Sequence, residues 1–491
     1  MEPADAPRFR GLASRGPKRG AGLDVAFAVL NRIAMPTRRT FLHRTAAAAG
    51  GLALAAPLAA APRFPRIFRA SGSEKVRMGF IGVGMRGRSH VELAARRTDV
   101  EIVAINDIEP RALADTQKAL RDAGRPEAEV YDRSPFDYQR MLERRDLDAV
   151  IVSTPWEWHV PQAVAAMRAG KAVGLEVSGA ADVSECWQLV DAQEETGAPL
   201  MFLENVCYRR DVIAVLNMVR QGLFGETVHF ECGYQHDLRG VKFNDGVGPY
   251  ARGAEFGPKG YSEARWRTLH SQFRNGDLYP THGVGPVMTM IDANRGNRLT
   301  RITSMATKSR GLHNYVVDVG GAAHPNASVR FALGDIVTSM IQTSGGETIV
   351  MTHDTNLPRP YSLGFRVQGT KGLWMDLNKS LHFEGTSPAH RWEEAQPYLD
   401  RYDHPLWRRY GADASGAGHG GMDFFVLHAF VEALKRKEPM PLDVYDAAVM
   451  MALTPLSEAS VARGGEPMDI PDFTRGRWIS RPPIFALTDE Y

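Results

Sequence analysis

Cysteine is scarce in this sequence: 491 residues contain three, at positions 186, 207 and 232. So few cysteines exclude a disulfide framework, and because no C-x-x-C pair occurs, they also exclude a zinc ribbon. The sequence has no G-x-S-x-G nucleophile elbow, no H-E-x-x-H zinc motif and no Walker A loop. These absences leave serine-hydrolase, metalloprotease and P-loop chemistry without support, and no metal site is predicted.

A strong charge of one sign is also missing. The formal net charge is +2, but residues 1–61 hold 9 Lys/Arg and 3 Asp/Glu, which leaves 50 and 54 in the other 430 residues, a net of −4. With that net charge, residues 62–491 as a whole do not attract nucleic acid. Hydrophobic residues make up 44% and charged residues 24%, as in ordinary globular proteins, and the length predicts more than one domain.

The N-terminal region contains a bland uncharged run from Thr45 to Ala61, 17 residues long and too short for a convincing membrane span. It follows Arg38-Arg39 and ends in three alanines, which is typical of a twin-arginine export signal. A short anchor or an alanine-rich helix is the alternative. We expect residues 1–61 to be a leader and signal peptide, 62–75 to be a linker, and the protein to be periplasmic. Met35 is an alternative start.

A strand, a glycine-rich turn, a helix and a second strand follow one another between residues 77 and 107. Gly82, Gly84 and Gly87 have the spacing that gives a tight turn, close approach to a pyrophosphate and close helix–strand packing. Asp107 ends the second strand, where an acid accepts from a ribose hydroxyl and favours NAD over NADP. The alternative, an ordinary glycine-rich turn, does not explain why all four features agree.

Strands and helices continue to alternate up to residue 205, with expected helices at 161–169 and 183–197. This alternation predicts a Rossmann domain at 76–206 with a doubly wound parallel sheet. Ligands bind at the carboxyl ends of such strands. The polar residues expected there are Asp107, the run 156–159, Glu176 and Asn205.

After residue 207 no helix alternates with the strands. We expect an α+β domain at 207–491 with an open, mainly antiparallel sheet. Its expected strands are 227–234, 301–307, 327–343 and 362–369, with helices at 209–222 and 422–434. Residues 239–280 read as an insertion that lines the cleft. Tyrosine and histidine together supply a proton donor and a base near neutral pH, and this domain contains Tyr234, His236, Tyr279, His282, Tyr361 and His419.

Seven runs carry a family likeness: GVGMRGRSH (82–90), TPWEWH (154–159), EVSGA (176–180), ENVCYRR (204–210), YQHDLR (234–239), YPTHGVGP (279–286) and GHGGMDFF (418–425). On these runs the sequence resembles the glucose–fructose oxidoreductase and inositol dehydrogenase superfamily. Within that superfamily it is similar to glycoside hydrolase family 109, the NAD-dependent α-N-acetylgalactosaminidases. Sugar dehydrogenases of the superfamily usually read Glu-Lys-Pro after the fifth strand, with the lysine relaying a proton. Here the run is Glu176-Val177-Ser178, and a valine cannot move a proton.

The resemblance implies a site residue by residue. With the glycine loop, NAD would be held by Met85, Arg86, Asp107, Trp156, Glu157, Trp158, His159, Glu176, Val177 and Asn205. The sugar would be held by Tyr234, Arg267, Tyr279, Pro280, Thr281, His282 and Tyr361. Tyr279 and His282 would be the acid/base pair.

The family chemistry implied is hydrolysis of terminal N-acetylgalactosamine glycosides by oxidation at C3, elimination, hydration and reduction. Such an enzyme recycles its NAD and needs no paired carboxylates, which suits export of a folded protein. One alternative is an exported NAD(P)-dependent sugar oxidoreductase, which the missing lysine disfavours. The other is a non-catalytic sugar-binding protein, which the intact run 279–282 disfavours. The partner expected is a small glycoside, and the sequence leaves the oligomeric state open, including a homo-oligomer.

Overall fold

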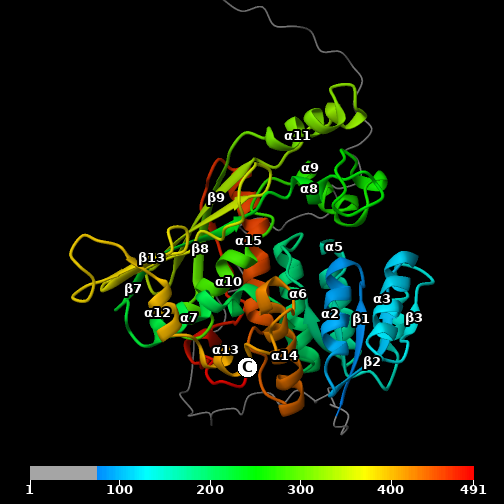
Figure 1. The fold of residues 1–491 in the computed structure, drawn as a ribbon, viewed down its shortest axis with the longest axis horizontal. Helices are drawn as coiled ribbons and strands as arrows, with labels where there is room; N and C mark the ends of the chain where they lie inside the picture. Colours follow the sequence, from blue (N-terminus) through cyan, green and yellow to red (C-terminus); the bar gives the residue numbers. More distant parts are fainter. Residues whose placement is uncertain (1–74) are drawn as a thin grey trace, which may run out of the picture. The chain divides into compact units, whose positions relative to one another are not determined.

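The computed structural model of the chain describes residues 75–491 (Figure 1). The predicted leader and export signal, at 1–61, and all but the last residue of the predicted linker lie outside the described residues. Within 75–491, no helix is both long and apolar enough to cross a membrane.

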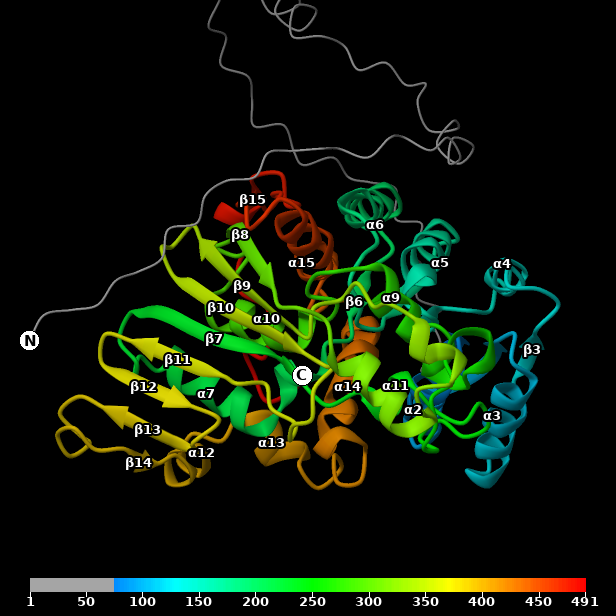
Figure 2. The ribbon, with the colours of Figure 1, turned by 90° about the horizontal axis from the view of Figure 1, so that it is seen from above.

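The first sheet is six-stranded and parallel, with strand order β3-β2-β1-β4-β5-β6; its two edge strands, β3 and β6, are labelled in Figure 2. This is the doubly wound order, in which the chain changes direction beside β1 and leaves a crevice at the carboxyl ends of the strands. The predicted Rossmann sheet is therefore confirmed. Its strands are β1 (Val76–Ile81), β2 (Val100–Asn106), β3 (Glu129–Tyr131), β4 (Ala149–Val152), β5 (Ala172–Leu175) and β6 (Leu200–Phe202). The helices between them are α2 (Met85–Ala95), α3 (Pro110–Asp122), α4 (Tyr138–Leu142), α5 (Trp156–Arg168) and α6 (Val183–Thr196).

Helix α5 starts earlier than predicted, because the expected helix was 161–169 and the observed one begins at Trp156. Pro155 occupies the N-cap position, and Pro161 is accommodated inside the helix, where it removes one backbone donor without ending it. The run 156–159 therefore forms the first turn of a helix and not a loop.

The second sheet has nine strands in the order β14-β13-β12-β11-β7-β10-β9-β8-β15. All neighbours are antiparallel except β7 and β10, so the sheet is mixed but mainly antiparallel, as predicted. Burial alternates along β9, which leaves one face of that strand open. The strands are β7 (Thr227–Gln235), β8 (Leu299–Ala306), β9 (Ile336–Thr343), β10 (Thr348–Asp354), β11 (Arg366–Gly369), β12 (Gly372–Met375), β13 (Ser380–Phe383), β14 (Glu393–Glu394) and β15 (Met468–Asp469).

The predicted strand 327–343 is wrong in its first half. A short 3-10 turn occupies Pro325–Ser328, and the strand begins only at Ile336. Pro325 stands at the start of that turn, and the side chain of His324 accepts from the backbone N–H of Asn326, so a local turn replaces strand pairing. The predicted strand 362–369 likewise begins only at Arg366.

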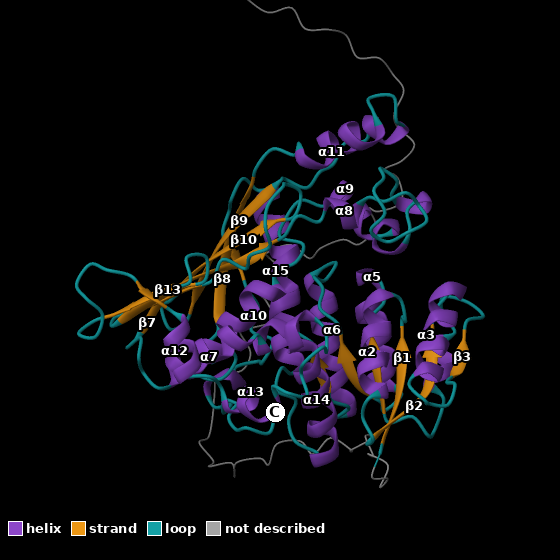
Figure 3. Cartoon of the chain, viewed as in Figure 1, coloured by secondary structure: helices purple, strands orange, loops and turns teal. Residues whose placement is uncertain are grey.

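Two C-terminal helices cover the first sheet and join it to the second. Helix α14 (Met422–Arg436) contacts α2 and β1, while α15 (Val444–Ala462) contacts both α6 and β8. Figure 3 shows α15 among the other helices between the two sheets. The sequence reading missed α15 because it is buried on almost all sides and has no polar face to give a helical period. The remaining helices of the second domain are α7 (Arg210–Arg220), α8 (Arg239–Lys242), α9 (Arg267–Phe273), α10 (Thr281–Met290), α11 (Gly311–Gly320), α12 (Gln396–Arg401) and α13 (Pro405–Tyr410).

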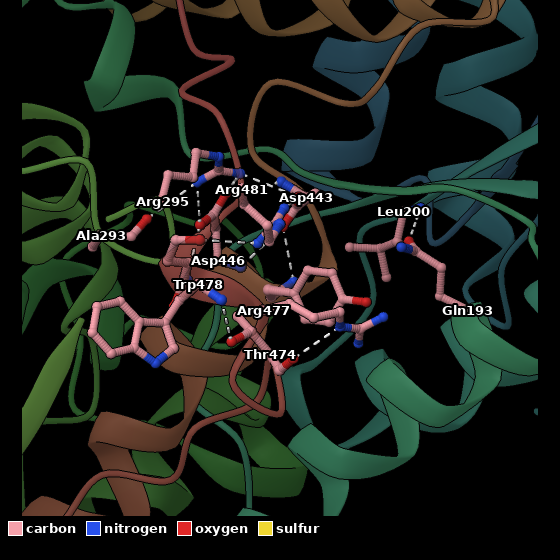
Figure 4. Close-up of polar contacts among 12 residues, drawn as sticks. Gln193, Leu200, Ala293, Arg295, Asp443, Asp446, Thr474, Arg477, Trp478 and Arg481 are labelled. Carbon is pink, nitrogen blue, oxygen red and sulfur yellow. Dashed lines mark hydrogen bonds and ion pairs between the residues drawn. The ribbon is translucent and has the colours of Figure 1, made fainter. Parts of the chain in front are cut away.

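The N-terminus of α15 is held by an ion cluster (Figure 4). Asp443 and Asp446 form a capping box at this end of the helix. Arg295 donates to Asp446 at 2.7 and 2.9 Å and to Asp443 at 3.1 Å, and Arg481 also pairs with Asp443. The cluster ties the segments that carry Arg295 and Arg481 to the helix that spans the two sheets.

Candidate active site

A cavity of about 310 Å³ lies where the carboxyl edge of the first sheet meets the second domain. Eleven of the predicted site residues line it, and they come from both domains. They are Met85, Arg86, Trp156, His159, Glu176, Val177, Asn205, Tyr234, Arg267, Tyr279 and His282. The predicted residues outside its lining are Gly82, Gly84, Gly87, Asp107, Glu157, Trp158, Pro280, Thr281 and Tyr361.

The glycine loop between β1 and α2 needs glycine at two of its positions. Gly82 has φ +81°, and a side chain at Gly87 would place its Cβ 1.9 Å from the carbonyl oxygen of Gly82. Gly84 faces open space, since a Cβ there would meet nothing within 4 Å. Asp107 braces the loop, because its carboxylate accepts from the backbone N–H groups of Val83 (2.8 Å) and Glu109 (2.9 Å). The loop is therefore closely packed at Gly82 and Gly87 and open to a ligand at Gly84, as a bound pyrophosphate requires.

Arg86 ties together two buried carboxylates on the first wall of the cavity. Its Nε donates to Glu176 Oε1 at 2.7 Å and its Nη1 to Asp423 Oδ2 at 2.7 Å. His90 Nε2 donates to the same Glu176 oxygen at 2.6 Å. Burial alone would raise the pKa of Glu176, but Arg86 and His90 outweigh burial and lower it to about 2. Glu176 is therefore an anion at any physiological pH and cannot donate a proton.

Asp423, which the prediction omitted, is the centre of the same network. Besides Arg86, its carboxylate accepts from Asn205 Nδ2 and from His419 Nδ1, both at 2.7 Å. Burial opposes ionisation here too, but the His419 and Arg86 contacts hold the pKa of Asp423 well below its usual range. The only signal in the sequence was its place in the run 418–425, four residues after a histidine.

His419 stands on the glycine-rich loop that precedes α14 and lines the cavity. Its backbone has φ +43°, between Gly418 and Gly420, which also have positive φ. The ring uses Nδ1 to pair with Asp423, and no contact is found for Nε2 among the described residues. This geometry leaves one ring nitrogen at the cavity rim for a ligand.

The first turn of α5 divides the predicted run 156–159. Trp156 and His159 are three residues apart, so they share one helix face and line the cavity. Glu157 points elsewhere and lies 3.5 Å from His270, while the ring of Trp158 packs edge-on against Phe136. Only half of this run therefore faces the cavity, for a reason that the helix period explains.

His159 has both ring nitrogens occupied by the protein. Nε2 donates to the carbonyl oxygen of Thr154 at 2.7 Å, and Nδ1 accepts from the hydroxyl of Ser178 at 3.1 Å. Burial lowers its pKa, so the ring is neutral. His159 is built into the wall and cannot serve as a proton carrier in this arrangement.

The second wall of the cavity is aromatic. The ring of Tyr279 lies 4.5 Å from that of Tyr234 and 5.8 Å from that of Trp156, measured between centroids. The guanidinium of Arg267 stands 5.2 Å from the rings of Trp156 and Tyr279, and its charge is balanced by Glu263. Burial raises the pKa of Tyr279 well above its ordinary value, so its phenol stays protonated.

His282 is held by a carboxylate that the prediction missed. Its Nδ1 lies 2.7 and 3.0 Å from the two carboxylate oxygens of Glu204, which is fully buried at the end of β6. Glu204 also accepts from the backbone N–H of Val206 at 3.0 Å. A proton on Nδ1 satisfies Glu204 and leaves Nε2 as the basic nitrogen. Glu204 belongs to the quoted run 204–210, but nothing in the sequence pairs it with a residue 78 positions away.

The remaining predicted sugar residues, Pro280, Thr281 and Tyr361, are not part of the cavity lining. Pro280 is the N-cap residue of α10, and Thr281 starts that helix with its hydroxyl fully buried. Tyr361 is 48% exposed, and its ring lies 4.9 Å from that of His236. Val177 does line the cavity and offers no proton-carrying group, as the sequence indicated.

Two protein-family models match successive parts of the chain. Residues 76–203 match the model described as "Oxidoreductase family, NAD-binding Rossmann fold", and residues 208–480 match "Glycosyl hydrolase 109, C-terminal domain".

Curated relatives match almost the whole length. A "Glycosyl hydrolase family 109 protein" of Stenotrophomonas maltophilia (strain K279a) is 55% identical over 90% of this chain and 98% of its own. An "Alpha-N-acetylgalactosaminidase" of Tannerella forsythia is 52% identical over 92% of this chain and 99% of its own. Among solved structures, a levoglucosan dehydrogenase in complex with NADH has a TM-score of 0.57 at 17% identity, over 81% of this chain and 99% of its own. At that identity the likeness concerns the fold.

The residues of the first wall fit NAD. The glycine loop leaves room above Gly84 at the N-terminus of α2, where free backbone N–H groups favour a phosphate. Two cavity-lining residues also carry buried polar atoms that have no hydrogen-bond partner among the described residues, Ser153 Oγ and Asn205 Oδ1. Buried polar atoms are seldom left unpaired, so these two indicate contacts that a ligand completes.

Proposed function

Since this chain belongs to glycoside hydrolase family 109, we propose that it is an NAD-dependent glycosidase that removes terminal α-linked N-acetylgalactosamine. The sugar is inferred from the name of the Tannerella forsythia relative. The observation that carries the mechanism is the cavity itself, which joins an NAD-fitting wall to an aromatic wall with a histidine–carboxylate pair.

Ordinary two-carboxylate hydrolysis lacks support in this cavity. It needs one carboxylic acid that gives up a proton and one free carboxylate. In the part of the chain that the structure describes, two acidic residues line the cavity, Glu176 and Glu263, and each is bound to an arginine. With its pKa lowered to about 2, Glu176 holds no proton to give.

NAD held by the residues of the first wall would supply a reversible hydride acceptor for C3 of the sugar. The ketone left when C3 gives up its hydride and its hydroxyl proton would acidify the neighbouring C2 proton. The residues of this chain then have to move protons. We assign His282 as the base: the proton on Nδ1 is fixed by Glu204, and Nε2 takes the C2 proton. Glu204 is a positioning residue that stabilises the imidazolium formed.

Tyr279 keeps its phenol proton because burial raises its pKa. It is therefore suited to donate a hydrogen bond to a sugar oxygen, either the C3 hydroxyl or the leaving-group oxygen. His419 is a second proton carrier, on the opposite wall, held by Asp423 through Nδ1 with Nε2 left for a ligand. Val177 supplies no relay, which separates this site from that of a superfamily dehydrogenase.

The test is to purify the protein without added nucleotide and offer nitrophenyl α- and β-glycosides of N-acetylgalactosamine, galactose and glucose. Nitrophenol release and absorbance of reduced nicotinamide are recorded together. We expect many turnovers of nitrophenol with no lasting gain of reduced nicotinamide. A single rise of reduced nicotinamide to the enzyme concentration, without nitrophenol, would instead identify an oxidoreductase awaiting a second substrate.

We further propose export by the twin-arginine route to the periplasm. The support is the Arg38-Arg39 pair before the bland run 45–61 and a cofactor that is regenerated in each turnover. Exchanging both arginines for lysine should leave the protein in the cytoplasmic fraction. Cytoplasmic location of the unchanged protein would reject the proposal.

A further inference from the structure

The insertion predicted at 239–280 contains an outer loop, residues 244–265, that has its own internal support. Asn244 exchanges backbone hydrogen bonds with Glu255, and its fully buried side chain bonds to the backbone of Tyr261 at 2.8 and 3.1 Å. A small hydrophobic cluster, separate from the main core, supports the loop: Phe243, Ala254, Phe256, Leu312, Val316 and Phe331. The outer loop therefore keeps its shape without help from the first domain.

The segment that follows the outer loop is packed firmly against the first domain. The ring of Trp156, at the start of α5, lies 5.2 Å from that of Trp266 and 5.0 Å from that of His270. Trp156 is buried. These ring contacts fix one end of the outer loop to the first domain.

The outer loop itself meets the first domain at the start of α3, through exposed polar groups. Arg265 Nη1 donates to Glu109 Oε2 at 3.0 Å. Arg111 Nη1 donates to the carbonyl oxygen of Val247 at 3.4 Å, and its guanidinium lies 5.0 Å from the ring of Tyr261. The side chains of Arg265 and Glu109 are 51% and 39% exposed. Exposed pairs of this kind are weak, so the contact with α3 can break while the buried ring contacts hold.

This contact lies beside the predicted ribose site. The backbone N–H of Glu109 donates to Asp107, the acid expected to accept from a ribose hydroxyl. Elsewhere along the outer loop, Tyr250 and Glu263 line the catalytic cavity. The loop therefore extends from the cavity to the adenosine end of the crevice in which ligands of this fold bind.

Apolar side chains lie exposed on both segments that meet here. Ile108, directly after Asp107, is 63% exposed, and Val247 of the outer loop is 68% exposed. A single exposed apolar side chain is ordinary. One on each of two contacting segments, beside a ribose site, suits the flat and largely apolar ring of an adenine.

We propose that the outer loop is the outer wall of the adenosine site, and that the Glu109–Arg265 pair retains NAD by holding this wall against α3. NAD then enters and leaves only when the loop separates from α3. The proposal rests on the proposed function, in which the hydride returns in every turnover and the cofactor need not be exchanged. Glu109 and Arg265 are positioning residues, since they act on NAD through the loop.

The experiment measures how fast NAD leaves the whole protein. The protein is loaded with NAD and freed of excess, and the NAD still bound is measured at intervals after denaturation. Glu109→Arg and Arg265→Glu each place two like charges in contact, so each should speed the loss by about three- to tenfold. The double exchange restores an opposite pair and should return the rate to within about twofold of the parent. Arg252→Glu, the same charge change at an exposed position of the loop, is the matched control and should change nothing.

Two outcomes of the loss measurement would overturn the proposal. One is an unchanged rate in both single variants. The other is a double variant that loses NAD as fast as Glu109→Arg alone, because residue 109 would then act on NAD directly through Asp107. The same proteins loaded with ADP-ribose, which lacks nicotinamide, should show the same order of rates. Equal loss of ADP-ribose from all of them would reject the adenosine wall.

Hydrogen exchange of the NAD-loaded proteins gives a second readout, on the loop itself. Residues 245–260 should exchange faster in both single variants than in the parent, with α11 unchanged as the internal reference. Equal exchange of 245–260 would show that the pair does not hold the loop. These measurements need no glycoside. Faster NAD loss in the single variants without nitrophenol release would keep the wall and reject the proposed function, and the reverse result would reject the wall alone.

Discussion

The two walls of the cavity treat their buried carboxylates in opposite ways. On the first wall, Glu176 and Asp423 share the cation of Arg86, and both pKa values are held low. On the second wall, the carboxylate of Glu204 has only a histidine and a backbone N–H as partners among residues 75–491. Among the described residues, the carboxylate of Asp277, two residues before Tyr279, accepts one hydrogen bond, from the N–H of Tyr279, and has no cation beside it.

This difference distinguishes the wall that would hold the cofactor from the wall that would carry out the proton transfers. A wall of fully paired charges keeps one arrangement, which suits a cofactor that stays bound through turnover. A wall with one histidine on one carboxylate keeps a proton that can move, which suits catalysis. Four substitutions test whether the two walls differ in this way.

His282→Ala removes the proposed base from the second wall. We expect turnover of the nitrophenyl glycoside to fall by about 10³-fold or more, the upper range for general base catalysis. Bound NAD, measured after denaturing the purified protein, should stay unchanged, because the first wall is intact. His313→Ala, an exposed histidine on α11, is the control. Full activity of His282→Ala would remove His282 from the mechanism.

Arg86→Met breaks the first wall by leaving Glu176 and Asp423 without their shared cation. Uncompensated buried charges of this kind cost about 3–5 kcal/mol, so the free energy of unfolding should fall by that amount. The purified protein should also retain little NAD. Arg88→Met, on the same helix as Arg86, is the control, because Arg88 pairs with two exposed carboxylates, Glu92 on α2 and Asp115 on α3. Normal NAD content in Arg86→Met would show that the network does not hold the cofactor.

Asp277→Asn tests the buried carboxylate behind the second wall, which has no cationic partner among the described residues. Burial raises the pKa of Asp277 to about 7, above its unfolded value, so the native state is favoured while the group keeps its proton. That stability is complete below the unfolded pKa and is lost as the pH rises through about 7. Asn carries no charge, so the variant should be more stable than the parent at pH 8, by on the order of 2–4 kcal/mol, with little difference near pH 4. Equal stability of the two proteins at pH 8 would show that Asp277 is not buried as an anion.

Glu204→Gln keeps the hydrogen bond to His282 but removes the charge that stabilises its protonated form. We expect kcat to fall by about 10–100-fold, as for other residues that orient a reacting histidine, with KM little changed. The pH dependence of kcat should shift as well, which a purely structural role would not cause. Restored activity in Glu204→Asp, measured with the same glycoside, would support positioning through charge. A loss confined to KM would contradict it.

The two-domain fold of this protein can be predicted from its sequence. The glycine spacing, the alternation of apolar strands and helices and the change after residue 207 predict the two sheets, because periodicity and turn chemistry are local. The quoted runs lead to family 109, to NAD and to eleven residues that line one cavity. These features depend on residues near one another along the chain.

Which side chains work in pairs depends on how distant segments of the chain pack together. Glu204 meets His282 and Arg86 meets Asp423 across 78 and 337 positions, distances over which a sequence pattern carries no information. Helix α15 was missed because burial on all sides erases the period that marks a helix. The first turn of α5 decided that Trp156 faces the cavity and Trp158 does not. Proton chemistry depends on contacts of about 3 Å, and those contacts are set by packing between elements and not by their order in the chain.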